Sequence, residues 1–140
     1  MRQLTIALAG ASLTVAPAWA AASAHETYSG YIRCSSQAMV AKIISQTIPR
    51  RPDGRPNAMS AEGITVVIAT PDEYQTMSDR WEAAAIALSV VDENAVNHDV
   101  ADALGQIQHD LDSATDRNRE LVSIFDDLDG CKRDLPASTR

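Results

Sequence analysis

The clearest pattern of apolar and polar positions lies in the last third of the chain, where apolar residues recur at alternating intervals of four and three. Nine positions form this series, and all but Asn118 are apolar: Val100, Leu104, Ile107, Leu111, Ala114, Asn118, Leu121, Phe125 and Leu128. This spacing aligns side chains along one stripe of a helix and is typical of a coiled-coil seam. It predicts one long helix over residues 98–129, with Asn97 or Asp99 as its N-cap and Gly130 at its end.

A second helix is predicted directly upstream, over residues 71–93. Thr70 suits the N-cap, Pro71 suits the first turn, and Glu73 can bond back to the cap amide. Six apolar positions then repeat at intervals of three and four: Tyr74, Met77, Trp81, Ala84, Leu88 and Val91. Because the link to the next helix is short, the two helices should form an antiparallel hairpin.

The pattern nearer the N-terminus is less regular. A first helix is predicted over residues 26–48, although Ser35 and Ser36 interrupt its apolar face. Residues 58–69 are ambiguous, because the β-branched run over residues 64–68 suits a strand but has no evident pairing partner. We therefore expect a short helix or an irregular apolar plug in this segment.

Residues 1–24 have the organisation of a secretory signal peptide. A positive amino-terminal end precedes an uncharged apolar run over residues 4–15, and small-x-small cleavage sequences end at Ala20 and Ala24. The apolar run is shorter than the roughly 20 residues that a membrane-spanning helix needs. We therefore expect one exported domain over residues 25–140, without a membrane span, in a bacterial periplasm or secreted.

Cys34 and Cys131 are the two cysteines of the chain, and neither belongs to a Cys-x-x-Cys sequence. In an oxidising space they most simply form one disulfide, with two free thiols or an intermolecular bridge as the alternatives. The bond would set the first and last helices antiparallel, which makes the first and middle helices parallel to each other. The predicted fold class is all-α: a disulfide-pinned bundle of three to four helices.

Charge is distributed unevenly along the chain. There are 19 acids and 12 bases, for a formal charge of −7. Residues 72–140 hold 16 of the acids and 6 of the bases, whereas residues 25–71 hold 3 acids and 5 bases. The acidic balance argues against nucleic acid as a partner. We expect most of the acidic half to be a solvated face, with docking onto a basic partner as the functional alternative.

Three histidines are the candidates for metal chemistry. His98 and His109 can share one helix face, but about 16 Å along the axis separates them, too far for one ion. His25 would become N-terminal if cleavage follows Ala24, and its amine and ring nitrogen could then chelate copper. The chain has no Gly-x-Ser-x-Gly elbow, phosphate-binding loop or haem-attachment sequence. We therefore expect no cofactor and assign no catalytic residue.

An arginine-rich loop is the first candidate for an interaction surface. Arg50, Arg51 and Arg55 alternate with prolines between the first helix and the ambiguous segment. Guanidinium groups held in such a loop can reach carboxylates or phosphates. The alternative interpretation is an ordinary solvated connector.

The predicted seam is the second candidate surface. If the long helix overhangs its shorter neighbours, Leu121, Phe125 and Leu128 are left uncovered, and a homodimer could form through the seam over residues 100–128. Asn118 would then act as a polar residue that fixes the register. The alternative is that the first helix covers these side chains, which the disulfide favours.

These observations predict a non-catalytic protein that binds another macromolecule, with a protein as the partner. Accessory, inhibitor, immunity and chaperone-like roles all fit. The alternative is a metal- or small-ligand-binding bundle that uses His25 or the His98 and His109 pair. A structural subunit that self-assembles through heptad seams is the second alternative.

Overall fold

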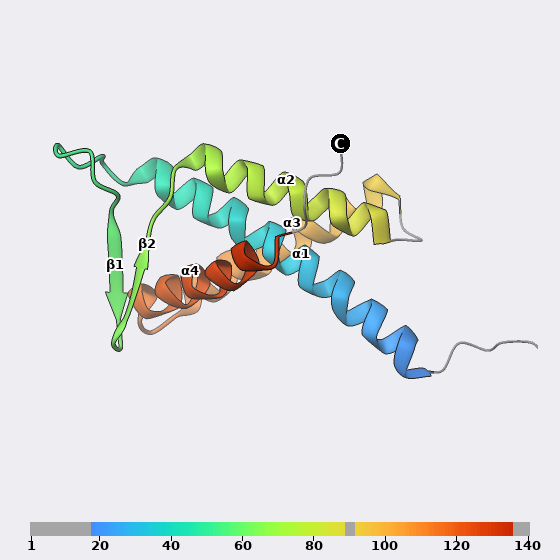
Figure 1. Cartoon of the computed structure of the whole chain (residues 1–140). Helices are drawn as coiled ribbons and strands as arrows, with labels where there is room; N and C mark the ends of the chain where they lie inside the picture. Colours follow the sequence, from blue (N-terminus) through green and yellow to red (C-terminus); the bar gives the residue numbers. More distant parts are fainter. Residues whose placement is uncertain (1–17, 89–91, 136–140) are drawn as a thin grey trace, which may run out of the picture.

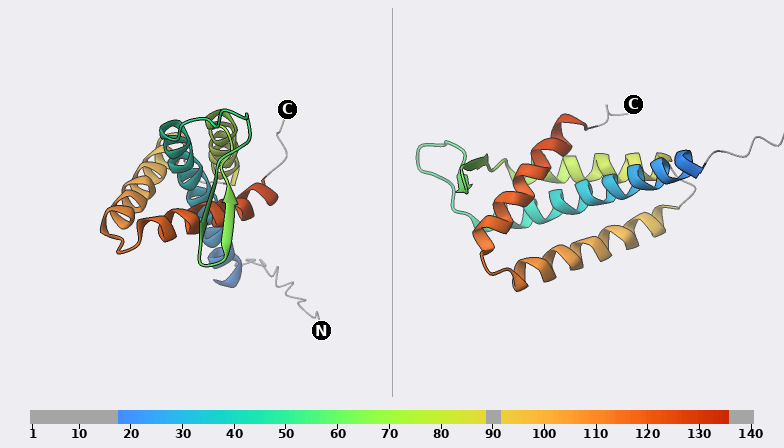
Figure 2. Two further views of the ribbon diagram at one scale, coloured as in Figure 1. Left: turned by 90° about the vertical axis from the view of Figure 1, so that its left-hand side faces the viewer. Right: turned by 90° about the horizontal axis from the view of Figure 1, so that it is seen from below.

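The computed structural model describes residues 18–88 and 92–135. Their helices and strands follow in the order α1 (Ala18–Thr47), β1 (Ala58–Ala61), β2 (Ile64–Val67), α2 (Pro71–Leu88), α3 (Glu93–Ser113) and α4 (Arg117–Arg133) (Figure 1). The first three helices alternate in direction, α4 crosses them obliquely, and the strands form a hairpin at one end (Figure 2). The prediction of a mostly helical, disulfide-pinned bundle is confirmed.

α1 and α2 make the most extensive contact of any two helices, and they run antiparallel. The Ser35 hydroxyl lies 2.9 Å from that of Ser78, while further along α1 the Lys42 ammonium donates to the side chain of Gln75 at 2.6 Å. Residue numbers therefore rise along one helix as they fall along the other. Small side chains with no solvent exposure line the contact and let the backbones approach closely: Ser35, Ser36, Ala38, Ala41, Ser78 and Ala85.

The antiparallel arrangement corrects the expected parallel one, and its cause is a break in the predicted long helix. Residues 98–129 do not form one helix: α3 ends at Ser113 and α4 begins at Arg117. Ala114 takes an extended conformation, and the Asp116 carboxylate caps α4 by accepting from the backbone N–H of Arg119 at 3.1 Å. The chain reverses between α3 and α4, so α3 runs opposite to the helix that carries Cys131 and in the same direction as α1. α2, which is antiparallel to α3, therefore runs opposite to α1.

Two predicted helix ends are also wrong. α3 begins earlier than Asn97 or Asp99, because the Asp92 carboxylate accepts from the N–H of Ala95 at 2.8 Å and acts as the N-cap. Asp99 instead accepts a hydrogen bond from the Tyr28 hydroxyl at 2.5 Å. α4 continues through Gly130 to Arg133.

Residues 58–69 form a β-hairpin, so the predicted helix or plug is wrong. Met59 pairs with Val66 and Ala61 with Ile64 in an antiparallel register. The two turn residues, Glu62 and Gly63, have φ values of 50° and 79°, as a tight type I′ turn requires. The missing pairing partner was therefore the preceding four residues of the same segment.

The core of the described residues lies where α1, α2, α4 and the hairpin meet. Its largest cluster contains Cys34, Ala38, Ala41, Val66, Ile68, Tyr74, Met77, Trp81, Val122, Phe125, Leu128 and Cys131. Smaller clusters join α3 to the bundle through Ile32, Ala85, Val96 and Val100, and through Val40, Leu111 and Ile124. α2, α3 and α4 thus each bury one apolar face, whereas α1 contributes to all three clusters and is buried on more than one face.

The start of α2 confirms the predicted capping box. The backbone N–H of Thr70 donates to the Glu73 carboxylate at 2.9 Å, and the N–H of Glu73 donates to the Thr70 hydroxyl at 3.3 Å. These bonds to Thr70 lower the pKa of Glu73 below its ordinary value of 4.5. The charged form of Glu73 therefore stabilises the folded state.

We expect Glu73→Gln to lower the free energy of unfolding by a few tenths of a kcal/mol at neutral pH, since the side chain is exposed. Because the folded pKa is lowered, the difference from the wild type is present above pH 4.5 and disappears as the pH falls through the folded pKa. Urea unfolding between pH 7 and 3 measures it. A double-mutant cycle with Thr70→Ala should show coupling, and additive effects would contradict the capping assignment.

Candidate functional site

The predicted disulfide is present and joins Cys34 to Cys131, with a sequence separation of 97. Cys34 lies midway along α1, and Cys131 lies in the last turn of α4. The bond therefore fixes the crossing of these two helices, and both cysteines are buried. A disulfide is the state expected of two cysteines in an oxidising compartment.

The arginine-rich loop is exposed and partly paired within itself. The Arg51 guanidinium bonds to the Asp53 carboxylate at 3.0 Å and 3.2 Å, and the backbone N–H of Arg55 donates to the same group at 3.0 Å. The Arg51 bond lowers the pKa of Asp53. Arg50 is exposed on the same loop, beside a hollow of about 390 Å³ at the start of α2. Two of the three arginines are thus engaged with one aspartate.

The seam residues do not form the predicted open surface. Phe125 and Leu128 are each 2% exposed and belong to the main core, while Leu121 is half-buried. They are covered because α4 turns back across α1 and α2 rather than overhanging them. Asn118 is exposed, and its side-chain amide donates to the carbonyl oxygen of Ser60 in the hairpin at 3.0 Å.

The histidines of α3 lie apart on its exposed surface. His98 is 75% exposed and its Nε2 lies 3.4 Å from the carboxylate of Asp102. His109 is also exposed, and its carbonyl oxygen accepts from the Ser113 hydroxyl. Among the described side chains, those of residues 26–88 and 92–135, no three from His, Cys, Asp or Glu are grouped closely enough to hold a metal ion. The side chain of His25 lies outside the described residues, so its predicted metal role stays a prediction.

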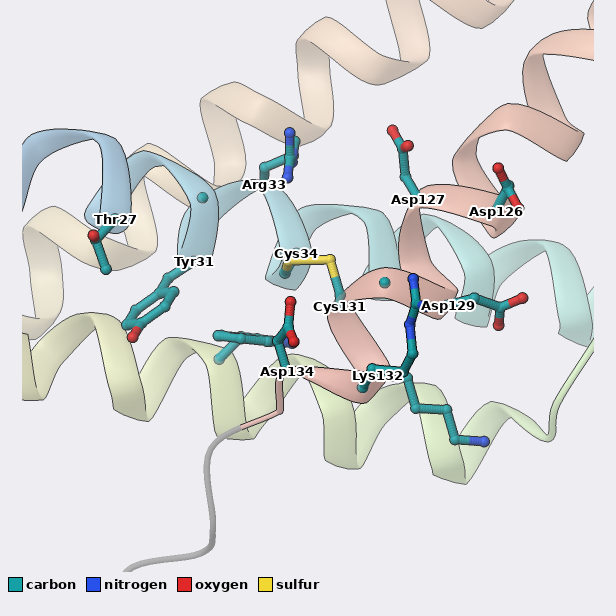
Figure 3. Close-up of a pocket in the computed structure, with 14 residues that line it drawn as sticks. Thr27, Tyr31, Arg33, Cys34, Asp126, Asp127, Asp129, Cys131, Lys132 and Asp134 are labelled. Atoms are coloured by element: carbon teal, nitrogen blue, oxygen red, sulfur yellow. A yellow bond between two sulfur atoms is a disulfide. The ribbon is translucent and has the colours of Figure 1, made fainter. Parts of the chain in front are cut away.

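A hollow of about 1000 Å³ lies beside the disulfide (Figure 3). Arg33 and Asp127 stand on one side of the sulfur atoms, and Asp134 and Lys132 stand on the other. The rings of Tyr31 and Trp81, with centroids 4.8 Å apart, contribute its apolar part. Four aspartates and three basic residues line this hollow, so a ligand would have to desolvate charges of both signs.

A smaller groove of about 340 Å³ lies between β2, α2 and α4. Its lining is mainly apolar and comes from Val67, Ala69, Tyr74, Met77, Phe125, Leu128 and Leu135. The charged groups at its margin are three carboxylates and one ammonium, those of Asp72, Glu73, Asp129 and Lys132. Apolar walls with few charges are typical of binding sites, which favours this groove over the larger hollow. We call it the β2 groove.

The strand that borders the β2 groove has an open edge. Asn57 and Ile68 form a hydrogen-bonded pair at 2.8 Å, so in this register Met59 with Val66 is the next bonded pair. The N–H and C=O groups of the alternate residues, Thr65 and Val67, therefore point away from β1. In the described residues the sheet has two strands, and neither a backbone nor a side-chain hydrogen bond reaches these groups.

Tyr74 limits how far the open edge extends. Its hydroxyl accepts from the backbone N–H of Ala69 at 2.8 Å, so the next outward-pointing group after Val67 is already bonded. Burial raises the pKa of this phenol, which stays protonated and neutral at physiological pH. The open edge therefore comprises the backbone of Thr65 and Val67.

Sequence reasoning identified neither the groove nor the edge. Both depend on the hairpin, and the one local signal for it was the Glu62-Gly63 pair between two short β-compatible runs. Comparison with protein-family models, with curated proteins and with solved structures found no match for this chain. None of the helices in residues 18–88 and 92–135 has the length and apolar content that crossing a membrane requires.

Proposed function

We propose that this chain is an exported, non-catalytic protein that binds another protein, and that the β2 groove is the binding face. The single observation that carries the proposal is the groove itself: a mainly apolar hollow between β2, α2 and α4, on a chain with a formal charge of −7. Val67 at its margin is 58% exposed, although it belongs to a strand whose neighbour Val66 is 1% exposed. Exposed apolar surface beside a rim of charges is typical of interaction sites.

Two features support the exported location. The disulfide requires an oxidising environment, such as the periplasm or the cell exterior. The predicted signal peptide agrees with this, although residues 1–17 lie outside the described residues. Cleavage after Ala20 or Ala24 would reach no further than the beginning of α1; among the side chains that the structure describes, those from Glu26 onward, the first buried one is Ile32.

Site-specific photo-crosslinking in the exporting cell tests the proposal. A benzophenone amino acid placed at Thr76, an exposed position that lines the groove, should give one discrete protein adduct of the mature chain in the periplasmic fraction. The matched control is the same amino acid at Gln108, exposed on α3 away from the groove. Absence of an adduct at Thr76, or an equal adduct from both positions, would contradict the groove as the binding face.

A further inference from the structure

We infer that the β2 groove takes an extended, basic segment of its partner, which adds to β2 as a third strand. The inference rests on the proposed function and specifies how the partner is held. Three features of the described residues lead to it: the hydrogen-bonding groups of the β2 edge, the apolar wall beside that edge, and the sign of the charges around the groove.

The open edge supplies the backbone contacts. Thr65 and Val67 each direct one N–H and one C=O away from β1, so a strand laid alongside can form up to four hydrogen bonds. The opposite edge of the hairpin is already engaged, because Asn118 of α4 bonds to the carbonyl oxygen of Ser60. The carboxylate of Glu62, in the turn, also pairs with Arg119 of α4 at 3.3 Å. β2 is therefore the edge that can accept a new strand.

The groove supplies contacts for alternate side chains of that strand. Successive side chains of an extended segment point to opposite faces, so every second one can face the same wall. Val67 and Ala69 form the near side of the wall, and Met77, Phe125 and Leu128 form its far side. The volume of about 340 Å³ suits a few aliphatic side chains rather than a whole helix.

Charge selects a basic segment over an acidic one. Asp72, Glu73 and Asp129 outnumber the single ammonium of Lys132 around the groove. A lysine or arginine at either end of the bound segment would meet these carboxylates, whereas an acidic segment would be repelled. The same argument disfavours a second copy of this chain, whose formal charge is −7. The occupant is therefore a partner segment with alternating apolar residues and at least one basic residue.

Binding of defined peptides to the folded, oxidised protein tests the inference. The probe is an N-acetylated peptide of about nine residues in which valine and threonine alternate between terminal lysines, and a peptide with terminal glutamates is its charge control. We expect calorimetry to detect the lysine peptide, with affinity that falls at high salt, and the glutamate peptide to bind at least tenfold more weakly. Equal affinity for both peptides would overturn the basic selectivity.

Variants at the strand edge test the backbone contacts. Thr65→Pro removes an outward N–H without removing a backbone hydrogen bond to β1, and should weaken the lysine peptide at least tenfold; its loss of the hydroxyl contact with Ser60 is shared by the matched control. The matched Thr65→Val change keeps that N–H and should bind like the wild type. Equal binding by both variants would overturn strand addition. Circular dichroism establishes that each variant is folded.

Peptides N-methylated at either the valine or the threonine nitrogens provide a test that needs no change in the protein. Alternate N–H groups of a strand point to opposite sides, so strand addition predicts that only one of the two methylated peptides loses binding. Equal behaviour of the two would overturn the inference. If the Thr76 adduct forms but no peptide binds, the proposed function stands and the strand-addition mode is wrong. A dimer that Thr65→Pro dissociates would identify a second copy as the occupant, and would also overturn it.

Discussion

Replacing both cysteines, by Cys34→Ser together with Cys131→Ser, is expected to lower the free energy of unfolding by about 4–5 kcal/mol. The bond closes a loop with a sequence separation of 97, and the entropy lost by the unfolded chain grows with the length of such a loop. A loss of this size is a large share of the 5–15 kcal/mol that is typical of a small domain. Urea unfolding of the two proteins at the same pH measures the difference.

A reductant provides the control for this result. Dithiothreitol should destabilise the wild type by a similar amount and leave the double variant unchanged, because the variant has no bond to reduce. If the double variant unfolds at the same urea concentration as the oxidised wild type, the disulfide contributes little to the free energy of unfolding. Packing alone then holds α4 across α1. Single replacements would be harder to interpret, since each leaves a free thiol.

Truncating the one aromatic ring of α4, by Phe125→Ala, should cost about 3–5 kcal/mol of stability. Phe125 is 2% exposed and its ring lies 5.9 Å, centroid to centroid, from that of Tyr74 in the main core. Removing it leaves a cavity among side chains from α1, α2 and the hairpin, which cannot all move inward to fill the space. Thermal or urea unfolding measures the loss.

The same variant decides between two interpretations of the α4 seam. If Phe125 belongs to the core, the variant loses stability and keeps the oligomeric state of the wild type. If it formed a dimer surface, the variant would keep its stability as a monomer and light scattering would show a change in mass. Ile43→Ala is the matched control: Ile43 is apolar but 56% exposed, so its truncation should change stability by less than about 0.5 kcal/mol.

The helix content of the last two thirds of the chain was predictable from the sequence because α2, α3 and α4 each bury one apolar face. The intervals of three and four placed Tyr74, Met77 and Trp81 on the buried face of α2, where the structure has them. The capping box at Thr70 and Glu73 fixed the beginning of that helix, since its bonds involve residues only three apart. Local rules of this kind need no knowledge of the rest of the chain.

The break between α3 and α4 was not predictable from periodicity alone. Three residues, Ala114 to Asp116, separate the helices, and three is one of the two intervals of the seam itself. The intervals of three and four between apolar residues therefore continue in the sequence through the loop, although the chain reverses direction there. The overlooked signal was Asp116, whose carboxylate can cap a helix that starts at Arg117.

The candidate site was missed because it is built from residues far apart in the sequence. Val67, Met77 and Leu128 meet only after α4 has turned back over α2 and the hairpin has packed against α4. The missed helix break therefore misplaced the predicted interaction surface and left the groove unpredicted. The arginine-rich loop was predictable as an exposed segment, but its pairing of Arg51 with Asp53 depends on local loop geometry.

The alternating directions of α1, α2 and α3 also have a kinetic consequence. α1 and α2 form the most extensive helix pair, and helical bundles of this size fold in about microseconds to milliseconds. Thiol oxidation takes seconds or longer. Collapse of the bundle should therefore bring Cys34 and Cys131 together before either is oxidised. An oxidase would then meet two adjacent thiols in a nearly finished molecule, which leaves little time for either sulfur to couple with another chain.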